Sequence, residues 1–305
     1  MQKNILMLMV VALGMWTSCA EDKDLGPDVP FGADYTIPQG KSPADDRVVE
    51  LFEKYGTYFL YDYTEADFYY TIVASSANAN ITTYRILGDP QYMGDMLDLL
   101  NDVWLKFYPK EFLAENLPYR VLVADTIKEV YSYVRPDNIL RTRLTANTMA
   151  VAGMNKNTKS MPADEKRKLK NELQKNFFTD LVNNGKLELP KEFYEVSDYS
   201  KAANTTPESA DYARTRGFVP SIDYEDLYGT VSEWCTYVDY KTKRLSETTD
   251  IMHFLKNMLC HAEDDPNSWG TYLTYPLVQK KHKILRDHFI AKYGVDIQAI
   301  GNGNK

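Results

Sequence analysis

The sequence predicts an α+β fold that is mostly helical, with a small sheet in the N-terminal half of the domain. Two observations support this prediction. Before about residue 155, short β-branched or aromatic runs lie between turn formers and predict strands. Beyond that point, the dominant pattern is apolar residues at spacings of three and four, which predicts helices. With 44% hydrophobic residues, residues 45–305 can form one domain around a sizeable core.

Residues 1–18 read as a signal peptide. A single basic residue, Lys3, precedes an apolar run from Ile5 to Trp16. This run is too short to span a bilayer, which takes about 20 helical residues, so we expect it to be removed. Small residues directly before Cys19 predict cleavage there and lipidation of the cysteine thiol, as in bacterial lipoproteins. An ordinary secretory signal with an incidental cysteine is the alternative.

Residues 19–44 are predicted to be a flexible tether. The acidic stretch 20–24 resembles the surface-export signal of lipoproteins from the Bacteroides group, so we expect an outer membrane lipoprotein displayed on the cell surface. Residues 25–44 contain four prolines and three glycines. A lipidated cysteine can hold a domain at a membrane, because each buried CH₂ contributes about 0.8 kcal/mol. No later segment is long and apolar enough to cross.

In the first half of the domain, Asp45 and Asp46 open a helix whose apolar face is expected to reach Phe59. A second helix is predicted over about 91–107. Between and after these helices, strands are predicted in the runs FYYTIVAS (68–75), YRVLVADTI (119–127) and TMAVAGMN (148–155).

The second half is predicted to be helical. A charged helix begins at Pro162, because proline suits a first helical turn, and ends at Asn184-Gly185. Its apolar face contains Leu169, Leu173, Phe177 and Leu181. Further helices are expected at about 225–240, 249–263 and 276–293.

The charge argues against a nucleic-acid partner. The formal net charge is −8 and becomes −9 when the signal peptide is removed with Lys3. An acidic chain without a basic stripe does not attract phosphate backbones. The two remaining cysteines, Cys235 and Cys260, could pair in an oxidising compartment or be buried thiols, and the sequence leaves both open.

The sequence contains no H-E-x-x-H motif, in which two histidines four residues apart bind zinc and the glutamate activates water. The four histidines are His253, His261, His282 and His288. Their separations of eight and six residues turn the second ring roughly 80° and 120° away from the first on a helix. A site built from His253 and Cys260 stays a minor alternative. Acidic pairs such as Glu225-Asp226 suit helix caps or solvated faces better than catalytic dyads.

Several blocks in order nevertheless resemble one family. They are LPYRVLVAD, TMAVAGMN, LVNNGKLELPKEFYEVS, RGFVPSIDYEDLYGTVSEW and KKHKILRDHFIAKYGVDIQAI, and the likeness covers most of residues 48–300. This family is the zinc-binding metallopeptidase lipoproteins of the Bacteroides group, also described as substrate-import-associated zinc metallohydrolase lipoproteins. The resemblance implies a zincin-like metallopeptidase scaffold. It also implies association with a TonB-dependent transporter and its paired surface lipoprotein.

The family pattern locates the expected zinc helix. In the family, the H-E-x-x-H helix is followed by a polar turn, a proline and a Phe-containing segment. The proline matches Pro190 of this chain, and the phenylalanine matches Phe193. Counting back from this proline places Asn176 and Asp180 at the histidine positions and Phe177 at the glutamate position. A second register places the motif on NELQK (171–175), keeping Glu172 but substituting Asn171 and Lys175 for the histidines.

The later part of the pattern is altered as well. A Gly-Phe-Val block matches residues 217–219, and the E-D-x-x-E helix that follows keeps Glu225 and Asp226 but has Gly229 in place of its last acid. Two imidazoles supply most of a zinc site's affinity, which an amide and one carboxylate do not replace. These six positions, 176, 177, 180, 225, 226 and 229, are therefore interpreted as the relic of a metal site.

The sequence thus favours a lipid-anchored accessory or binding protein of a nutrient-import system, without a catalytic centre or cofactor. One alternative is an active zinc hydrolase with an unrecognised site, and another is a structural or interaction lipoprotein unrelated to uptake. The 23 tyrosines and four tryptophans could stack on sugar rings, although Trp104 and Trp234 lie on expected core faces. Peptide, glycan and partner protein remain comparable candidate ligands.

Overall fold

The computed structural model describes residues 35–69, 81–131, 136–145, 147–223 and 246–303. Contacts within the chain separate residues 37–305 from residues 1–36. The unit 37–305 begins at Ile37, which packs against the core, and Gln39 Oε1 accepts a hydrogen bond from Tyr61 N at 3.0 Å. The expected signal peptide, Cys19 and most of the tether lie outside the described residues.

The α+β class is confirmed, and the described strands lie between residues 58 and 152. The main sheet has the order β1-β3-β7-β6. Strands β1 (Tyr58–Leu60), β3 (Arg120–Ala124) and β7 (Thr148–Ala152) are parallel, and β6 (Thr142–Thr145) runs antiparallel to β7 at one edge. Every residue of β3 is buried, as expected for a strand covered on both faces.

A second sheet has the order β2-β4-β5 and is antiparallel. It contains β2 (Ile81–Ile86), β4 (Thr126–Tyr131) and β5 (Asn138–Leu140). The sequence predicts one strand over 119–127, whereas the structure divides this run between β3 and β4, one in each sheet. The strand expected at 68–75 is not found at its start, where α3 (Glu65–Tyr69) is helical, and its remainder lies outside the described residues.

The first helix, α2 (Asp45–Tyr55), begins where the sequence predicts but ends earlier. Gly56 adopts a left-handed conformation with φ of +71°, and its N–H closes the helix on Phe52 O at 2.7 Å. Phe59 therefore belongs to β1 and not to the helix. The second predicted helix is found as α4 (Met93–Val103), followed after a short 3-10 turn by α5 (Lys110–Asn116).

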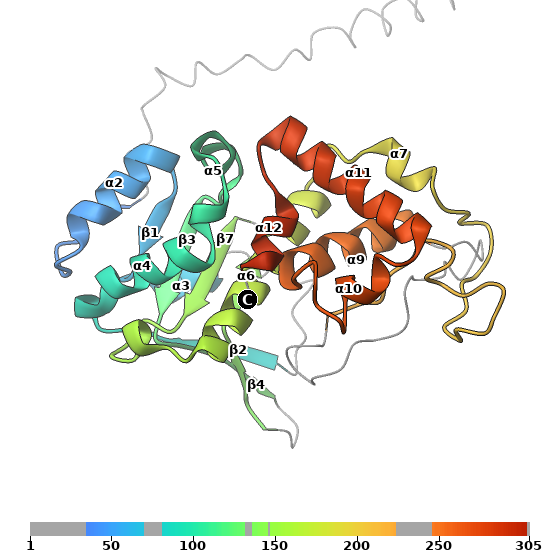
Figure 1. The fold of residues 1–305 in the computed structure, drawn as a ribbon. Coiled ribbons are helices and arrows are strands. Elements are labelled where there is room, and N and C mark those ends of the chain that lie inside the picture. Colours follow the sequence, from blue (N-terminus) through green and yellow to red (C-terminus); the bar gives the residue numbers. More distant parts are fainter. Residues whose placement is uncertain (1–34, 70–80, 132–135, 146, 224–245, 304–305) are drawn as a thin grey trace, which may run out of the picture. The chain divides into compact units, whose positions relative to one another are not determined.

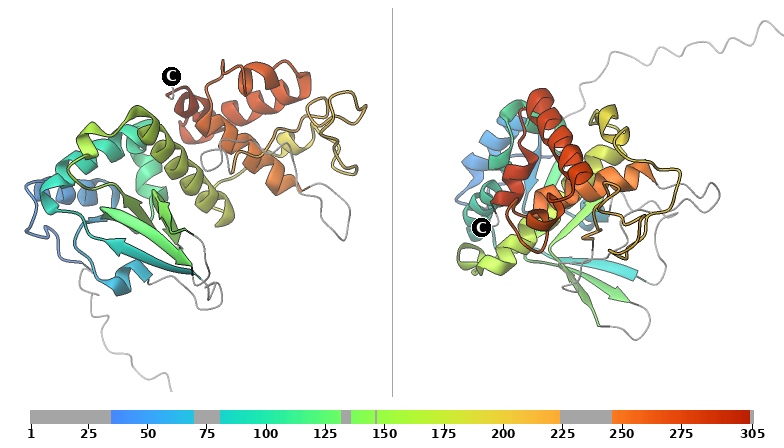
Figure 2. Two further views of the ribbon diagram at one scale, coloured as in Figure 1. Left: turned by 90° about the horizontal axis from the view of Figure 1, so that it is seen from below. Right: turned by 45° about the vertical axis from the view of Figure 1, so that its right-hand side comes forward.

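Helix α6 (Ala163–Asn183) lies between the strands and the C-terminal helices (Figures 1 and 2). It contacts α4, β6 and α9. The predicted apolar face is confirmed, since Leu169, Leu173, Phe177 and Leu181 are all buried. The Phe177 ring makes edge-to-face contacts with Trp104 at 5.3 Å and with Tyr108 at 5.6 Å between centroids.

The C-terminal part is helical, as predicted. It contains α7 (Lys191–Tyr194), α9 (Glu247–Cys260), α10 (Trp269–Tyr272), α11 (Pro276–Tyr293) and α12 (Ile297–Asn302). Helix α12 lies so close to α9 that a Cβ on Gly301 would be 2.2 Å from Met258 O. The helix expected at 225–240 lies outside the described residues. In the described part of the chain, no helix has the length and apolar character needed to span a membrane.

A buried charge network connects these helices. Lys281 on α11 donates to Asp250 Oδ2 on α9 at 2.6 Å and to Tyr199 Oη at 3.2 Å, and Tyr199 Oη donates to the same carboxylate oxygen at 2.5 Å. Both charged side chains are 0% exposed. The ammonium also lies 4.6 Å from the Phe193 ring centroid. Burial raises the pKa of Asp250 and lowers that of Lys281, and their ion pair opposes both shifts.

Removing one member of this pair should strongly destabilise the protein. We expect Lys281→Met to lower the free energy of unfolding by about 3–5 kcal/mol, because Asp250 would keep a buried charge without its cation. The double variant Lys281→Met/Asp250→Ala should lose less than the sum of the two single changes. Chemical denaturation measures all three variants.

The matched control is Lys283→Met on the same helix, where an ammonium pairs with Asp287 at 2.5 Å but is 74% exposed. This change should cost less than about 1 kcal/mol, as for other exposed pairs. Equal losses at positions 281 and 283 would contradict a structural role for the buried network.

Candidate functional site

A pocket of about 230 Å³ lies where the sheet edges meet α6 and α9. We call it the edge pocket. Its walls come from β5 and Arg141 directly before β6, from the middle of α6, from the loop before residue 224, and from α9. The lining residues are Asn138, Ile139, Leu140, Arg141, Glu172, Lys175, Asn176, Thr179, Asp223 and Lys256.

The contact between α6 and β6 depends on Thr142. Ala152 N donates to Arg141 O at 2.8 Å, so the backbone of Arg141 faces β7. Because successive residues of a strand point their N–H groups in opposite directions, the N–H of Thr142 points away from β7. The Thr142 N–H donates to Glu172 Oε1 at 2.9 Å, and its hydroxyl donates to the same oxygen at 2.6 Å. Asn176 Nδ2 donates to Thr142 Oγ1 at 2.8 Å. Glu172 thus covers a backbone donor that would otherwise be exposed at the sheet edge.

The remaining charges of the edge pocket are also engaged. Lys256 on α9 forms an ion pair with Asp223. Burial opposes ionisation of Asp223, but the hydrogen bond from Lys256 holds the pKa of this carboxyl below its usual value. Arg141 forms an ion pair with Glu165 at 2.7 Å. The pocket is therefore a polar surface with paired charges, beside the apolar side chains of Ile139 and Leu140.

The three residues of the first predicted register, Asn176, Phe177 and Asp180, lie in different environments. Asn176 lines the edge pocket, whereas Phe177 is 1% exposed and lies in the aromatic core. Asp180 is half-buried and accepts a hydrogen bond from Asn184 Nδ2 at 2.8 Å. Burial raises the pKa of Asp180, against opposing contributions from Lys186 and Asn184. Of these three positions, the structure brings only Asn176 into the edge pocket.

The second register fits the edge pocket better. Glu172 and Lys175 both line it, and Asn171 is buried beside α9, with its carbonyl 3.9 Å from Cys260 Sγ. The remaining predicted positions, Glu225, Asp226 and Gly229, lie outside the described residues. Cys235 does too, so the structure does not choose between the two alternatives for Cys235 and Cys260, a disulfide or two buried thiols.

The histidines lie elsewhere. His253, His261 and His282 are buried, and the ring nitrogen Nε2 of His282 is hydrogen-bonded to Gln298 Oε1 at 2.9 Å. Burial lowers the pKa of His282. His288 Nε2 is hydrogen-bonded to Glu188 O at 2.7 Å. None of these four side chains lines the edge pocket.

The edge pocket residues that the structure describes do not suit zinc. Zinc in proteins takes imidazole, thiolate or carboxylate ligands, usually three or four of them. On the pocket face of α6 these types are represented by Glu172 alone, next to the cationic Lys175. Within the described ranges, no three His, Cys, Asp or Glu side chains gather closely enough to hold a metal ion.

Sequence reasoning missed several residues of the edge pocket. Lys256 and Asp223 come from segments distant in sequence from α6, and no local pattern indicates that they meet. Thr142 could have been noticed, because Thr142 and Leu144 alternate as in a short strand directly before the predicted strand at 148–155.

Comparisons with known proteins add the following. No family model matches the chain, and no curated protein does. Among solved structures, the chain is similar to a crystal structure of a "putative zinc-binding metallo-peptidase" from Bacteroides caccae. The TM-score is 0.46 and the sequence identity 11%, over 89% of this chain and 94% of that chain.

The Glu172 contact gives a prediction for the sheet edge. Glu172→Ala removes the acceptor of two hydrogen bonds from Thr142, so we expect the free energy of unfolding to fall by about 1–3 kcal/mol. The Thr142 amide should also exchange its hydrogen faster, as measured by NMR. Glu192→Ala, at an exposed position of α7, serves as the control and should change neither quantity. Unaltered exchange at Thr142 would contradict the assigned role of Glu172.

Proposed function

We propose that this chain is a lipid-anchored cell-surface protein that binds a ligand in the edge pocket without hydrolysing it. The proposal is supported by the kind of side chains on the part of α6 that lies beside the edge strand β6. The side chains that α6 presents there are Glu172, Lys175, Asn176 and Thr179. This set can form hydrogen bonds and ion pairs but lacks the imidazole pair of a zinc hydrolase.

The carboxylate at position 172 is engaged in the structure. A general base must be positioned to take a proton from water. Glu172 Oε1 instead accepts two hydrogen bonds from Thr142, and this contact stabilises the position of β6. This contact favours binding over metal-assisted hydrolysis.

The dimensions and chemistry of the pocket suit part of a larger polar ligand. Pockets for drug-sized molecules usually measure about 300–1,000 Å³. At about 230 Å³, the edge pocket would hold one amino-acid side chain or one sugar ring. Asn176, Thr179 and Lys175 offer hydrogen-bond donors, and Ile139 offers an apolar surface. A segment of a peptide or glycan carries groups complementary to both.

The proposal includes a place in the cell. A lipid on Cys19 and the tether after it would hold the domain at the outer membrane surface. There the protein would serve nutrient import beside a TonB-dependent transporter and its paired surface lipoprotein. The scaffold would be that of a metallopeptidase whose zinc site has been lost.

Anchoring is tested by Cys19→Ala. We expect this variant to leave the membrane fraction or to accumulate as an unprocessed precursor, because the thiol is the proposed point of lipid attachment. Cells producing each form are labelled with a palmitate analogue and fractionated. Cys260→Ala is the control and should keep both the label and the membrane association. Equal membrane retention of the wild type and Cys19→Ala, with no label on either of them, would refute lipidation.

Zinc content tests the absence of a hydrolytic centre. The purified mature chain should contain well below one equivalent of zinc, and a chelator should leave its melting temperature unchanged. Elemental analysis and thermal melts measure these quantities, and incubation with a peptide library checks for cleavage. Binding of one zinc, combined with a lower melting temperature after chelation, would favour the hydrolase alternative.

A further inference from the structure

The second sheet presents three large apolar side chains to solvent. Tyr84 and Ile86 on β2 are 48% and 57% exposed, and Ile139 on β5 is 59% exposed. In the strand register, Tyr84 lies opposite Lys128 of β4, and Lys128 lies opposite Ile139. Cross-strand partners point to the same face of a sheet, so these three side chains form one row. Ile86 points the same way, two residues after Tyr84. We call the surface formed by Tyr84, Ile86, Lys128 and Ile139 the outer face.

The other face of this sheet packs against the domain. Ile127, which lies between Arg85 and Leu140 in the register, is 0% exposed. Arg85 Nη2 donates to Tyr63 O at 3.2 Å. An antiparallel sheet with one buried face usually carries polar side chains on the face toward water. Adjacent large apolar side chains on that face therefore indicate a contact surface.

The outer face is continuous with the edge pocket through Ile139. This side chain lines the pocket and also stands at the end of the cross-strand row. Neighbouring strands lie about 4.8 Å apart, so the backbone of Tyr84 lies roughly 10 Å from that of Ile139, across two strand spacings. A ligand longer than one amino-acid side chain or one sugar ring can therefore occupy the pocket and also reach the ring of Tyr84.

The charges of this combined surface favour a ligand without net charge. Lys256 in the edge pocket is paired with Asp223, and Lys128 on the outer face forms an ion pair with Asp137 at 2.6 Å. A charged ligand would compete with these pairs, whereas hydroxyl groups can form hydrogen bonds beside them. In the pocket, the Thr179 hydroxyl is both a donor and an acceptor for such groups.

The position on the face of the sheet favours a sugar over a peptide. An extended peptide is bound mainly through main-chain hydrogen bonds to an open strand edge. The main-chain groups of β4 are engaged with β2 and β5, so the outer face presents side chains only. A sugar ring has an apolar face, which can lie on an aromatic or aliphatic side chain, and hydroxyl groups around its rim. Tyr84 and Ile139 are side chains of these two kinds.

We propose that the outer face and the edge pocket form one binding surface for a neutral oligosaccharide, an inference that rests on the proposed ligand-binding function of the edge pocket. One sugar ring occupies the pocket beside Thr179, and a later ring of the same chain lies on the Tyr84 ring. Ile139 contacts the ligand where it leaves the pocket.

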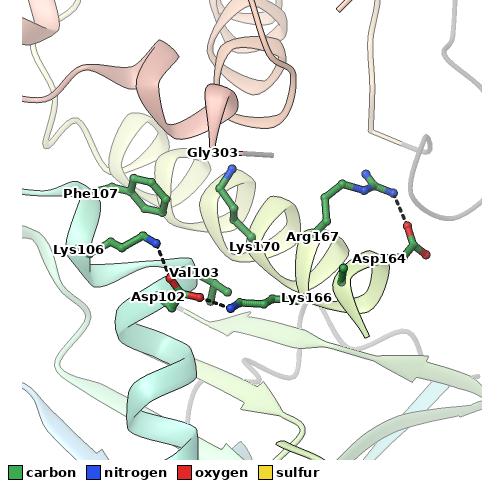
Figure 3. Close-up of a pocket in the computed structure, with 10 residues that line it drawn as sticks. Asp102, Val103, Lys106, Phe107, Asp164, Lys166, Arg167, Lys170 and Gly303 are labelled. Carbon is green, nitrogen blue, oxygen red and sulfur yellow. Dashed lines mark hydrogen bonds and ion pairs between the residues drawn. The ribbon is translucent and has the colours of Figure 1, made fainter. Parts of the chain in front are cut away.

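A larger pocket, of about 490 Å³, lies beside the N-terminal half of α6 and shares no lining residue with the edge pocket (Figure 3). Two of its lysines, Lys106 and Lys166, both form ion pairs with Asp102. No residue of the outer face lines this pocket. It therefore provides a position for a control variant that leaves the proposed binding surface intact.

The test is calorimetric titration of the full mature chain with maltohexaose, cellohexaose, xylohexaose and mannohexaose, and with the corresponding monosaccharides. We expect at least one hexasaccharide to bind saturably and about tenfold or more tightly than its monosaccharide, because only the longer ligand reaches Tyr84. A fluorescently labelled pool of random hexapeptides, followed by anisotropy, tests the peptide alternative. Binding of peptides alone, weakened by Thr179→Val, would keep the proposed function of the edge pocket and overturn the oligosaccharide. Absence of binding in both classes would overturn both proposals.

Variants test the two parts of the surface separately. Tyr84→Thr removes the ring but keeps a residue that favours strands. It should weaken hexasaccharide binding by about threefold to tenfold and leave monosaccharide binding unchanged, whereas Tyr84→Phe should bind as the wild type does. Thr179→Val removes a hydrogen bond in the pocket and should weaken binding of both by a similar factor. The controls are Tyr119→Ala, at an exposed tyrosine outside the second sheet, and Lys166→Met, in the pocket of Figure 3. Both should bind as the wild type does.

Two results would overturn the proposal in different ways. Unchanged hexasaccharide affinity in Tyr84→Thr, with a loss in Thr179→Val, would keep the ligand in the edge pocket and overturn its extension over the outer face. A loss in Tyr84→Thr without a loss in Thr179→Val would overturn the proposed function of the edge pocket. Circular dichroism verifies folding. If Tyr84→Thr does not fold, Ile139→Thr takes its place and should weaken hexasaccharide binding.

Discussion

The packing of α6 against α4, β6 and α9 is the constraint on which both halves of the domain depend. A helix with neighbours on several sides cannot divide into one apolar face and one solvated face. Polar residues of α6 are accordingly buried and paired. Gln174, for example, accepts a hydrogen bond from Tyr108 and donates to Val103 O at 3.0 Å. An unpaired amide in this position would cost about 1–3 kcal/mol, so its partners determine how α4 meets α6.

The same constraint limits the chemistry of the edge pocket. Glu172 and Asn176 face the sheet edge, and both are hydrogen-bonded to the Thr142 side chain. Groups that fix an edge strand in place are not available to bind a metal or move a proton without releasing that strand. Lys175 and Thr179, on the same side of the helix, have side chains suited to ligand contact. One face of α6 thus both holds the edge strand in place and carries side chains for ligand contact. This arrangement favours a binding role.

A buried lysine shows how the fold satisfies a charge away from water. Lys281 has its counterion, Asp250, at 2.6 Å and four aromatic rings around it, in a region closed to solvent. The carboxylate and the ring faces both attract the ammonium, so this charge is stabilised within the fold.

The sequence by itself determined those features that depend on neighbours along the chain. Helices α4, α6 and α11 are predicted by apolar spacing, a local signal, and α6 also by Pro162 and Asn184-Gly185 at its ends. The buried face of α6 follows from the same spacing. The α2 boundary was missed, although Gly56 is a local signal for a helix end.

Only the tertiary structure decided which α6 residues face the edge pocket. Asn176 and Phe177 are neighbours in the sequence, but Asn176 lines the edge pocket, whereas Phe177 packs against Trp104 and Tyr108, because successive residues of a helix point about 100° apart. Glu172 meets Thr142 across 30 residues of chain, and Lys256 meets Asp223 across 33. Such contacts arise from how the sheet and helices assemble, and no periodicity within a single segment contains that information.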